Sequence, residues 1–222
     1  MRTLRLADEL LLIAYDDDTG RNRATGLELG LAGSLLLELA LSERLRVDGR
    51  KKVHVVSAAS IGDEFADEAL ARVGADKPRT ARSWVNTFSR KLLPRVRERL
   101  VGEGVLREEV HKVFGLFPYR YYPLADGRGE GEARARLERA AGNGVAGDAR
   151  TAALAGLIRA TSLERRALPG LSSWEARRVV KGLAEAGWAG EATREAIAAT
   201  QMAVIAAVTA SVAASTAATS GG

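Results

Sequence analysis

Apolar residues recur at helical spacing through most of the chain. The segment 4–15 places its leucines on one broad face, and the segment 27–45 is a strongly apolar helix. Within it, Gly30 and Gly33 permit close contact with another helix, at some cost in helix propensity. We therefore predict a mainly α fold: a single-domain helical bundle around a buried apolar helix, with projecting β-hairpins. Further helices are predicted at 62–73, 151–168, 172–187 and from 191 onward.

Two β-hairpins interrupt this pattern. Residues 45–56 form two short β-rich runs around Asp48-Gly49. A second hairpin is expected to begin with a strand over 105–110, to turn near His111-Lys112 and to return through an aromatic run. In that run, "VFGLF" is expected at the tip and "PYRYYPL" in the return strand.

The basic helix before the second hairpin restarts at Pro94, which is tolerated best in a first turn. Leu93, Val96 and Leu100 mark its buried face. The arginines of this region are expected to point elsewhere: Arg90, Arg95, Arg97 and Arg99. Arg97 is a candidate either for a binding site or for a surface ion pair with an acid such as Glu68.

The length of 222 residues suits one domain over 1–222 or two small ones. The Gly-, Arg- and Glu-rich segment 126–150 is the best place for a seam between subdomains. The last segment is apolar enough to suggest a membrane span, but Ala dominates it and polar residues interrupt it. We expect a small-residue helix at the centre of the bundle, ending in a frayed tail at 215–222.

Composition restricts the chemistry. The chain has no cysteine, which excludes disulfides, and its two histidines are too few for a histidine-based metal site. It lacks the P-loop, GxGxxG, HExxH and GxSxG motifs. We therefore expect no enzyme activity, no catalytic residue, no metal and no cofactor. The amino terminus lacks a signal-peptide cleavage site, so the expected compartment is the cytosol.

The chain has 33 Lys and Arg against 28 Asp and Glu, a net charge of +5. This balance favours polyanions as partners, either nucleic acid or an acidic membrane surface, although a coding bias toward Arg is also consistent with it. A basic helix followed by a hairpin is also the end of a winged-helix DNA-binding module. That module needs cations at the wing tip, whereas this hairpin carries apolar and aromatic residues, which suit a bilayer interface. The rings could instead pack against the protein's own helices or another subunit.

The order of the motifs resembles the Golgi phosphoprotein 3 family over nearly the whole chain. The matching stretches include "LADELLLIAYDDDTG", "GLAGSLLLELALSERLRV", "SWVNTF", "VRERLVGEGVL" and "FGLFPYRYYPL". The resemblance implies a mainly helical domain that binds phosphatidylinositol 4-phosphate in a basic pocket and inserts the apolar tip of a hairpin into the membrane. It also implies self-association, here through the hairpin, and binding of cytosolic tails of membrane proteins.

Of the family's headgroup contacts, Arg97 matches one arginine, whereas Pro94 and Ala32 occupy the positions of two others, and the 16–29 loop lacks the family's Trp. A looser site for an anionic lipid is therefore expected. Its candidate residues are Arg97, Arg90, Lys91, Arg95, Arg21 and Arg23, and the membrane-inserting residues are Val113, Phe114, Leu116 and Phe117. The expected function is reversible binding at the cytosolic face of a membrane, with nucleic-acid binding and a hairpin-mediated scaffold as alternatives.

Overall fold

Helix α2 (Leu27–Leu41) lies at the centre of the bundle, and most of its residues are buried. Helix α1 (Leu6–Ala14) packs against it and is buried along its whole length. The computed structural model describes residues 4–17, 19–113, 117–185 and 192–220. The other helices are α3 (Glu64–Ala75), α4 (Ala81–Phe88), α5 (Leu92–Gly102), α6 (Arg128–Asn143), α7 (Ala149–Ala160), α8 (Glu164–Ala167), α9 (Ser173–Glu185) and α10 (Ala192–Ser220).

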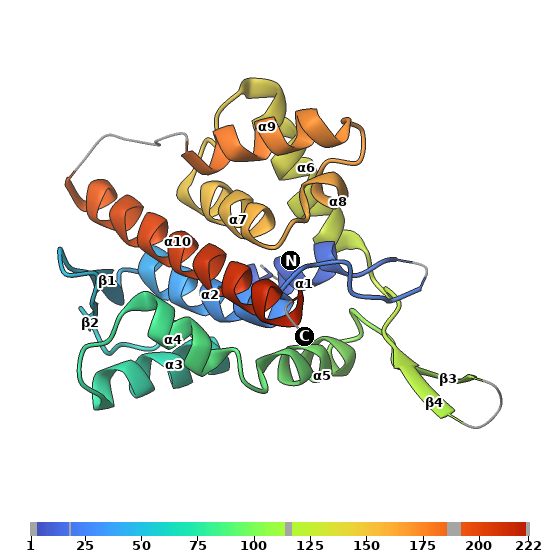
Figure 1. The fold of residues 1–222 in the computed structure, drawn as a ribbon, viewed down its shortest axis with the longest axis horizontal. Helices are drawn as coiled ribbons and strands as arrows, with labels where there is room; N and C mark the ends of the chain where they lie inside the picture. Colours follow the sequence, from blue (N-terminus) through green and yellow to red (C-terminus); the bar gives the residue numbers. More distant parts are fainter. Residues whose placement is uncertain (1–3, 18, 114–116, 186–191, 221–222) are drawn as a thin grey trace.

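Helices α3, α4 and α5 lie on one side of the α1–α2 pair, and helices α6 to α9 lie on the other (Figure 1). The two sheets of the described residues are antiparallel hairpins: β1 (Leu45–Val47) with β2 (Val53–Val55), and β3 (Glu109–Val113) with β4 (Phe117–Tyr121). The predicted fold class and the first hairpin are therefore confirmed. The buried apolar helix of that prediction is α2.

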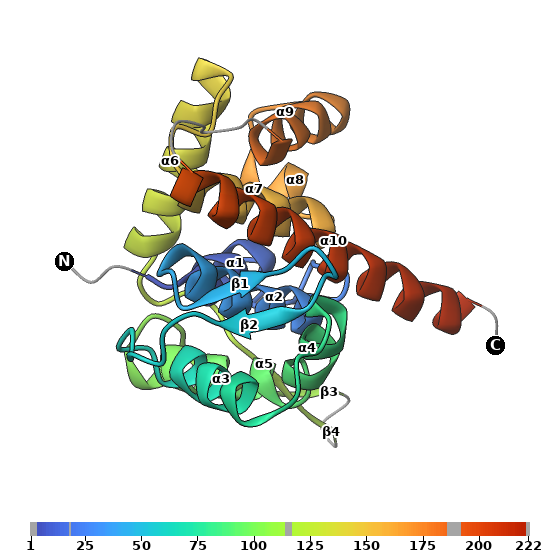
Figure 2. The same cartoon turned by 90° about the vertical axis from the view of Figure 1, so that its left-hand side faces the viewer.

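Helix α10 crosses the outside of α2 and also contacts α4 and α7. Gly33 permits this approach, because a Cβ there would lie 2.3 Å from a methyl carbon of Val208. One face of α10 is buried, but its last turns are exposed and extend beyond the helices beneath them (Figure 2). The expectation that this helix occupies the centre of the bundle is wrong, because α2 is more apolar and fills that position.

By length and composition, one helix of the described part could cross a membrane, at Ile197–Thr219, with 39% of its most apolar window buried. Residues 215–220, where a frayed tail was expected, continue α10. Within 126–150, the segment proposed as a seam, helix α6 buries Ala133 and Leu137 in the same core as α1 and α2.

The register of the second hairpin differs from the expected one. His111 and Lys112 lie within β3, opposite Tyr119 and Pro118, so the turn predicted near them is wrong. Residues 105–106 precede the strand, with Leu106 forming an isolated bridge to Leu124. The last described pair is Val113 with Phe117. The paired strand therefore continues past the predicted turn, since the β-branched residues Val110 and Val113 favour extended structure.

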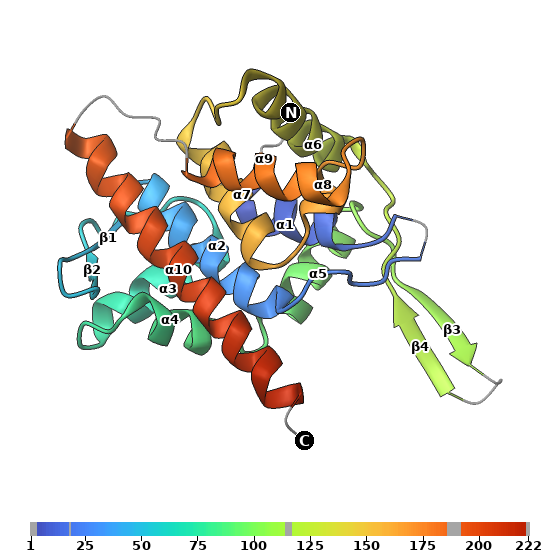
Figure 3. The ribbon, with the colours of Figure 1, turned by 45° about the horizontal axis from the view of Figure 1, so that its top comes forward.

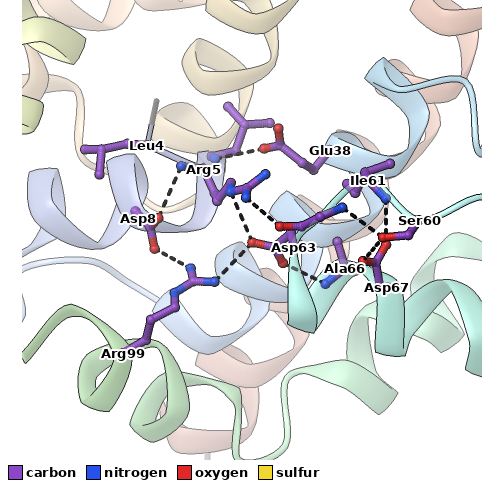
Figure 4. A network of polar contacts seen from close by, with 12 residues as sticks. Leu4, Arg5, Asp8, Glu38, Ser60, Ile61, Asp63, Ala66, Asp67 and Arg99 are labelled. Carbon is purple, nitrogen blue, oxygen red and sulfur yellow. Dashed lines mark hydrogen bonds and ion pairs between the residues drawn. The ribbon is translucent and has the colours of Figure 1, made fainter. Parts of the chain in front are cut away.

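A buried ionic network joins α1, α3 and α5 (Figure 4). Arg99 of α5 pairs with Asp8 of α1 and, at 3.0 Å, with Asp63, the N-cap residue of α3. Arg5 adds a 3.4 Å contact to Asp63, and its backbone N–H donates to Asp8. The Arg99 side chain is 16% exposed and its two carboxylate partners are almost fully buried. The expectation that Arg99 points away from the core is wrong, because these carboxylates compensate its burial.

A second ionic network ties α1 and α2 to the opposite side of the bundle. Arg150 of α7 lies 2.8 Å from Glu38 and 3.6 Å from Glu9, and Arg136 of α6 lies 2.8 Å from Glu9. These ion pairs are partly buried, so the helices on both sides of α1 and α2 are held in defined positions by charge as well as by apolar packing.

The titration of Asp8 is the basis of a pH-dependent prediction. Burial raises the pKa of the Asp8 carboxyl above its ordinary value, while the Arg99 guanidinium opposes the change. The folded state therefore holds this proton at a higher pH than the unfolded chain does. Stability contributed by this protonation is fully present below the ordinary pKa and is lost as the pH rises through the raised value.

Relative to Asp8→Asn, the wild-type protein is therefore expected to gain free energy of unfolding as the pH is lowered through this interval. Urea unfolding of both proteins at a series of pH values measures the difference. A difference that stays constant across the interval would contradict the raised pKa.

Candidate functional site

The β3–β4 hairpin projects from the bundle next to the carboxyl-terminal end of α5 (Figures 1 and 3). Its base is fixed by the Leu106–Leu124 bridge and by a 3.0 Å hydrogen bond from the Arg107 N–H to the Pro123 carbonyl. Pairing within the strands runs from Glu109–Tyr121 at the base toward the tip. The hairpin is thus continuous with the bundle at its base, while its strands contain exposed residues such as Val110.

Tyr122 follows β4 and turns back onto the bundle. Its ring lies 6.5 Å from the ring of the buried Tyr15, measured between centroids, and the Arg97 guanidinium lies 4.5 Å from the Tyr122 centroid. Because Tyr121 bonds to Glu109 across the hairpin at 2.6 Å, the two tyrosines face different ways. Arg97 is therefore held over an aromatic face at the base of the hairpin.

The loop between α1 and α2 packs against the hairpin at Tyr122. Gly20, with a φ of +57°, lies so close to the hairpin that a Cβ there would be 2.5 Å from backbone atoms of Tyr122. The Arg166 guanidinium of α8 donates to the carbonyls of Ile13 and Tyr15 and holds the start of this loop. Only glycine combines this φ with so close an approach. The loop and the base of the hairpin therefore form one packed unit, which we call the hairpin base.

The electrostatics of the hairpin base centre on Arg97. Burial raises the pKa of Tyr15, and Arg97 opposes this through its charge and a side-chain hydrogen bond. The Arg97 Nε is buried and has no hydrogen-bond partner in the described part of the chain. The guanidinium is thus positioned by aromatic rings rather than by a carboxylate, which leaves its positive charge available to an anion.

Two of the other candidate cations lie on the loop that packs there. Arg21 and Arg23 are both exposed. Arg23 pairs with Asp16 at 3.2 Å, whereas the Arg21 guanidinium forms no ion pair with a described residue. The loop therefore adds one paired and one unpaired arginine.

The remaining candidate cations lie elsewhere. Arg95 stacks over Phe65 and pairs with Glu68 at 2.7 Å, and the hydrogen bond with Glu68 raises the pKa of Arg95. The surface pairing with Glu68 suggested for Arg97 is thus made by Arg95. Arg90 lines a cavity with Arg95, and the exposed Lys91 precedes α5 with a φ of +65°. The structure therefore divides the six predicted headgroup residues between two regions of the surface.

The predicted membrane-inserting residues are described only in part. Phe114 and Leu116 lie outside the described residues. The backbones of Val113 and Phe117 form the last described pair of the hairpin. Their role at a membrane stays a prediction.

Sequence reasoning missed Tyr15, Tyr122 and Arg166 as parts of the site. Tyr15 ends the segment 4–15 that is predicted to be helical, and Tyr122 lies in the predicted return strand. Their contact joins segments far apart in the sequence, so no local spacing indicates it. The proline after Tyr122 and the glycine at position 20 are the only local signs of a fixed turn there.

Comparison with known proteins bears on the whole chain. The family model described as Golgi phosphoprotein 3 (GPP34) matches residues 6–200. No curated protein matches the chain significantly. The matched region contains α1 to α9, both hairpins and the first turns of α10, and so includes the hairpin base. The chain belongs to the Golgi phosphoprotein 3 family.

Proposed function

We propose that this protein is a non-enzymatic peripheral membrane protein that binds an acidic phospholipid headgroup, phosphatidylinositol 4-phosphate or a related anionic lipid, at the hairpin base. The observation that carries the proposal is the position of Arg97, stacked on Tyr122 where the hairpin leaves the bundle. The Golgi phosphoprotein 3 family is not an enzyme family. The membership of this chain in that family is consistent with a membrane-related role.

The headgroup would pair with Arg97 and with the exposed arginines of the neighbouring loop, Arg21 and Arg23. Each cation near an anionic surface contributes about 1 kcal/mol. Apolar residues of the hairpin tip would enter the interface, each 100 Å² or so of apolar area adding about 2.5 kcal/mol. Neither contribution anchors the protein alone, so binding would be reversible and located at the cytosolic face of a membrane.

The nucleic-acid alternative has less support. A recognition helix needs cations free to meet phosphates and bases. In α5, however, Arg95 and Arg99 are already paired with carboxylates, so only Arg97 of these three arginines has its charge available. Self-association through the hairpin and binding of cytosolic tails of membrane proteins stay proposals, tested by size exclusion of a hairpin deletion and by pull-down with tail peptides.

We expect Arg97→Gln to weaken binding to vesicles containing an anionic lipid at least about fivefold, the equivalent of about 1 kcal/mol. Vesicles of phosphatidylcholine alone, with phosphatidylserine and with phosphatidylinositol 4-phosphate separate simple charge from headgroup recognition in a flotation assay. Arg95→Gln is the matched control, since it removes the same charge from the same helix on the side facing Glu68.

The double substitution of Phe114 and Phe117 by serine tests the insertion of the hairpin tip and is expected to weaken binding to every anionic vesicle. Equal losses for Arg97→Gln and Arg95→Gln would show that only overall charge matters. An absence of binding at moderate salt would refute the proposed function.

A further inference from the structure

A cavity of about 470 Å³ lies between α3, α4 and α5. Its volume is in the range of small-molecule sites. Leu35, Phe65 and Leu92 line it and are buried, so the interior is largely apolar. Phe88, which stacks on the buried Trp84 at 5.2 Å, adds an aromatic wall. The described structure has no side chain that fills this space.

The polar lining of the cavity is basic. It includes Arg72, Arg90 and Arg95, with Glu68 as its acid. Arg95 is compensated, because it pairs with Glu68 at 2.7 Å and with Glu64 at 3.5 Å. This pair uses the cavity's own carboxylate.

Within the described part of the chain, Arg72 and Arg90 form no ion pair with a carboxylate. The charge of Arg72 acts on Asp76, but that carboxylate is already bound by Arg79. Arg90 forms no hydrogen bond or ion pair with a described residue. An apolar cavity therefore carries two guanidinium groups whose charge is available to a ligand.

We propose that this cavity binds a small carboxylate with an apolar body. The carboxylate would pair with Arg90 and Arg72, since guanidinium groups match the two oxygens of a carboxylate. The apolar body would lie against Leu35, Phe65 and Leu92. An inositol headgroup would match this interior poorly, because its hydroxyl groups would lose hydrogen bonds to water against apolar side chains. The ligand would be either a fatty-acid-like molecule or the carboxyl-terminal residue of an apolar peptide.

Calorimetric titration of the full chain with octanoate tests the proposal, with octanol as the uncharged probe of the same chain length. Tripeptides ending in leucine, with a free or an amidated carboxyl terminus, distinguish the peptide source from the free acid. We expect octanoate or the free-acid peptide to bind and the uncharged counterparts to bind at least about tenfold more weakly. Amide shifts by NMR should map the bound probe to α3, α4 and α5.

Two variants test the location. Arg90→Gln is expected to weaken binding about tenfold, and Thr87→Phe should block the cavity by volume, as Thr87 lines it. Arg177→Gln on α9 is the matched control, because it removes an exposed arginine outside the cavity lining. Thermal unfolding of each variant verifies that it is folded.

Binding of octanol as tight as that of octanoate would overturn the proposal, as would equal effects of Arg90→Gln and Arg177→Gln or no binding by either carboxylate. The Arg97→Gln variant separates this site from the hairpin base, since it is expected to weaken vesicle binding and to retain octanoate binding. Failure of one proposal is thus distinguishable from failure of the other.

Discussion

Replacing Arg99 by methionine is expected to lower the free energy of unfolding by about 3–5 kcal/mol, because it leaves buried carboxylates without their counter-charge. Asp8 would lose its only guanidinium partner in the described structure, and Asp63 would retain the 3.4 Å contact with Arg5 and the N-cap hydrogen bond from the Ala66 N–H. Methionine preserves much of the side-chain volume, so the effect comes from charge rather than from a cavity.

The control for this substitution is Arg95→Met, one turn earlier on the same side of α5. Its side chain is 39% exposed and its partners Glu64 and Glu68 are more exposed still. An ion pair of this kind contributes about 0–1 kcal/mol. Urea unfolding of the two variants and the wild type measures the contrast.

In thermal unfolding, the Arg99 variant should lose roughly 6–20 °C, at about 2–4 °C per kcal/mol for a chain of this size. Similar stability losses for the two variants would show that the buried ion pairs of Arg99 contribute no more to the free energy of unfolding than the exposed pairs of Arg95. Adding Asp8→Asn to Arg99→Met should recover part of the loss, because it removes the unpaired buried charge.

Replacing Gly20 by alanine is expected to destabilise the hairpin base by roughly 2–5 kcal/mol. Part of the effect is the cost of a left-handed backbone with a Cβ, about 1–2 kcal/mol. The rest is overpacking, about 1–3 kcal/mol, because the new Cβ would lie 2.5 Å from the backbone of Tyr122 and 2.7 Å from the nitrogen of Pro123. Backbone atoms cannot rotate away as a flexible side chain does, so the loop and the hairpin must separate.

Gly144→Ala is the matched control. Gly144 also has a positive φ, +71°, but a Cβ at this position would have no neighbouring atom of the described residues within 4 Å, so only the backbone cost of about 1–2 kcal/mol applies. Hydrogen exchange should show faster exchange of the Arg107 N–H in the Gly20 variant and not in the control, since that group bonds to Pro123.

The Gly20 variant also links stability to the proposed function. If the hairpin base positions Arg97 for a headgroup, Gly20→Ala should weaken vesicle binding by separating the loop from the hairpin. Gly144→Ala should weaken vesicle binding less. Unchanged exchange and unchanged vesicle binding in the Gly20 variant would contradict the packed arrangement of loop and hairpin.

The mainly helical class, the presence of both hairpins and the family could be predicted from the sequence, because they depend on local periodicity, turn residues and the order of motifs. The sequence also indicated the close approach at Gly33, where only the absence of a side chain admits Val208. In each case, the residues that carry the signal are neighbours in the chain. These local signals can be interpreted without knowledge of the tertiary contacts with other helices.

The roles of the arginines of α5 depend on contacts between distant segments, which the sequence does not show. Arg95 and Arg97 are two residues apart, and at 3.6 residues per turn they point to nearly opposite sides of the helix. Arg95 meets carboxylates of α3, Arg97 meets Tyr122, and Arg99 is drawn into the core by Asp8. These partners come from distant segments of the chain. Whether an arginine is buried, paired or available to a ligand depends on the group that it contacts. For that reason the sequence could supply the cations but could not place them in one site.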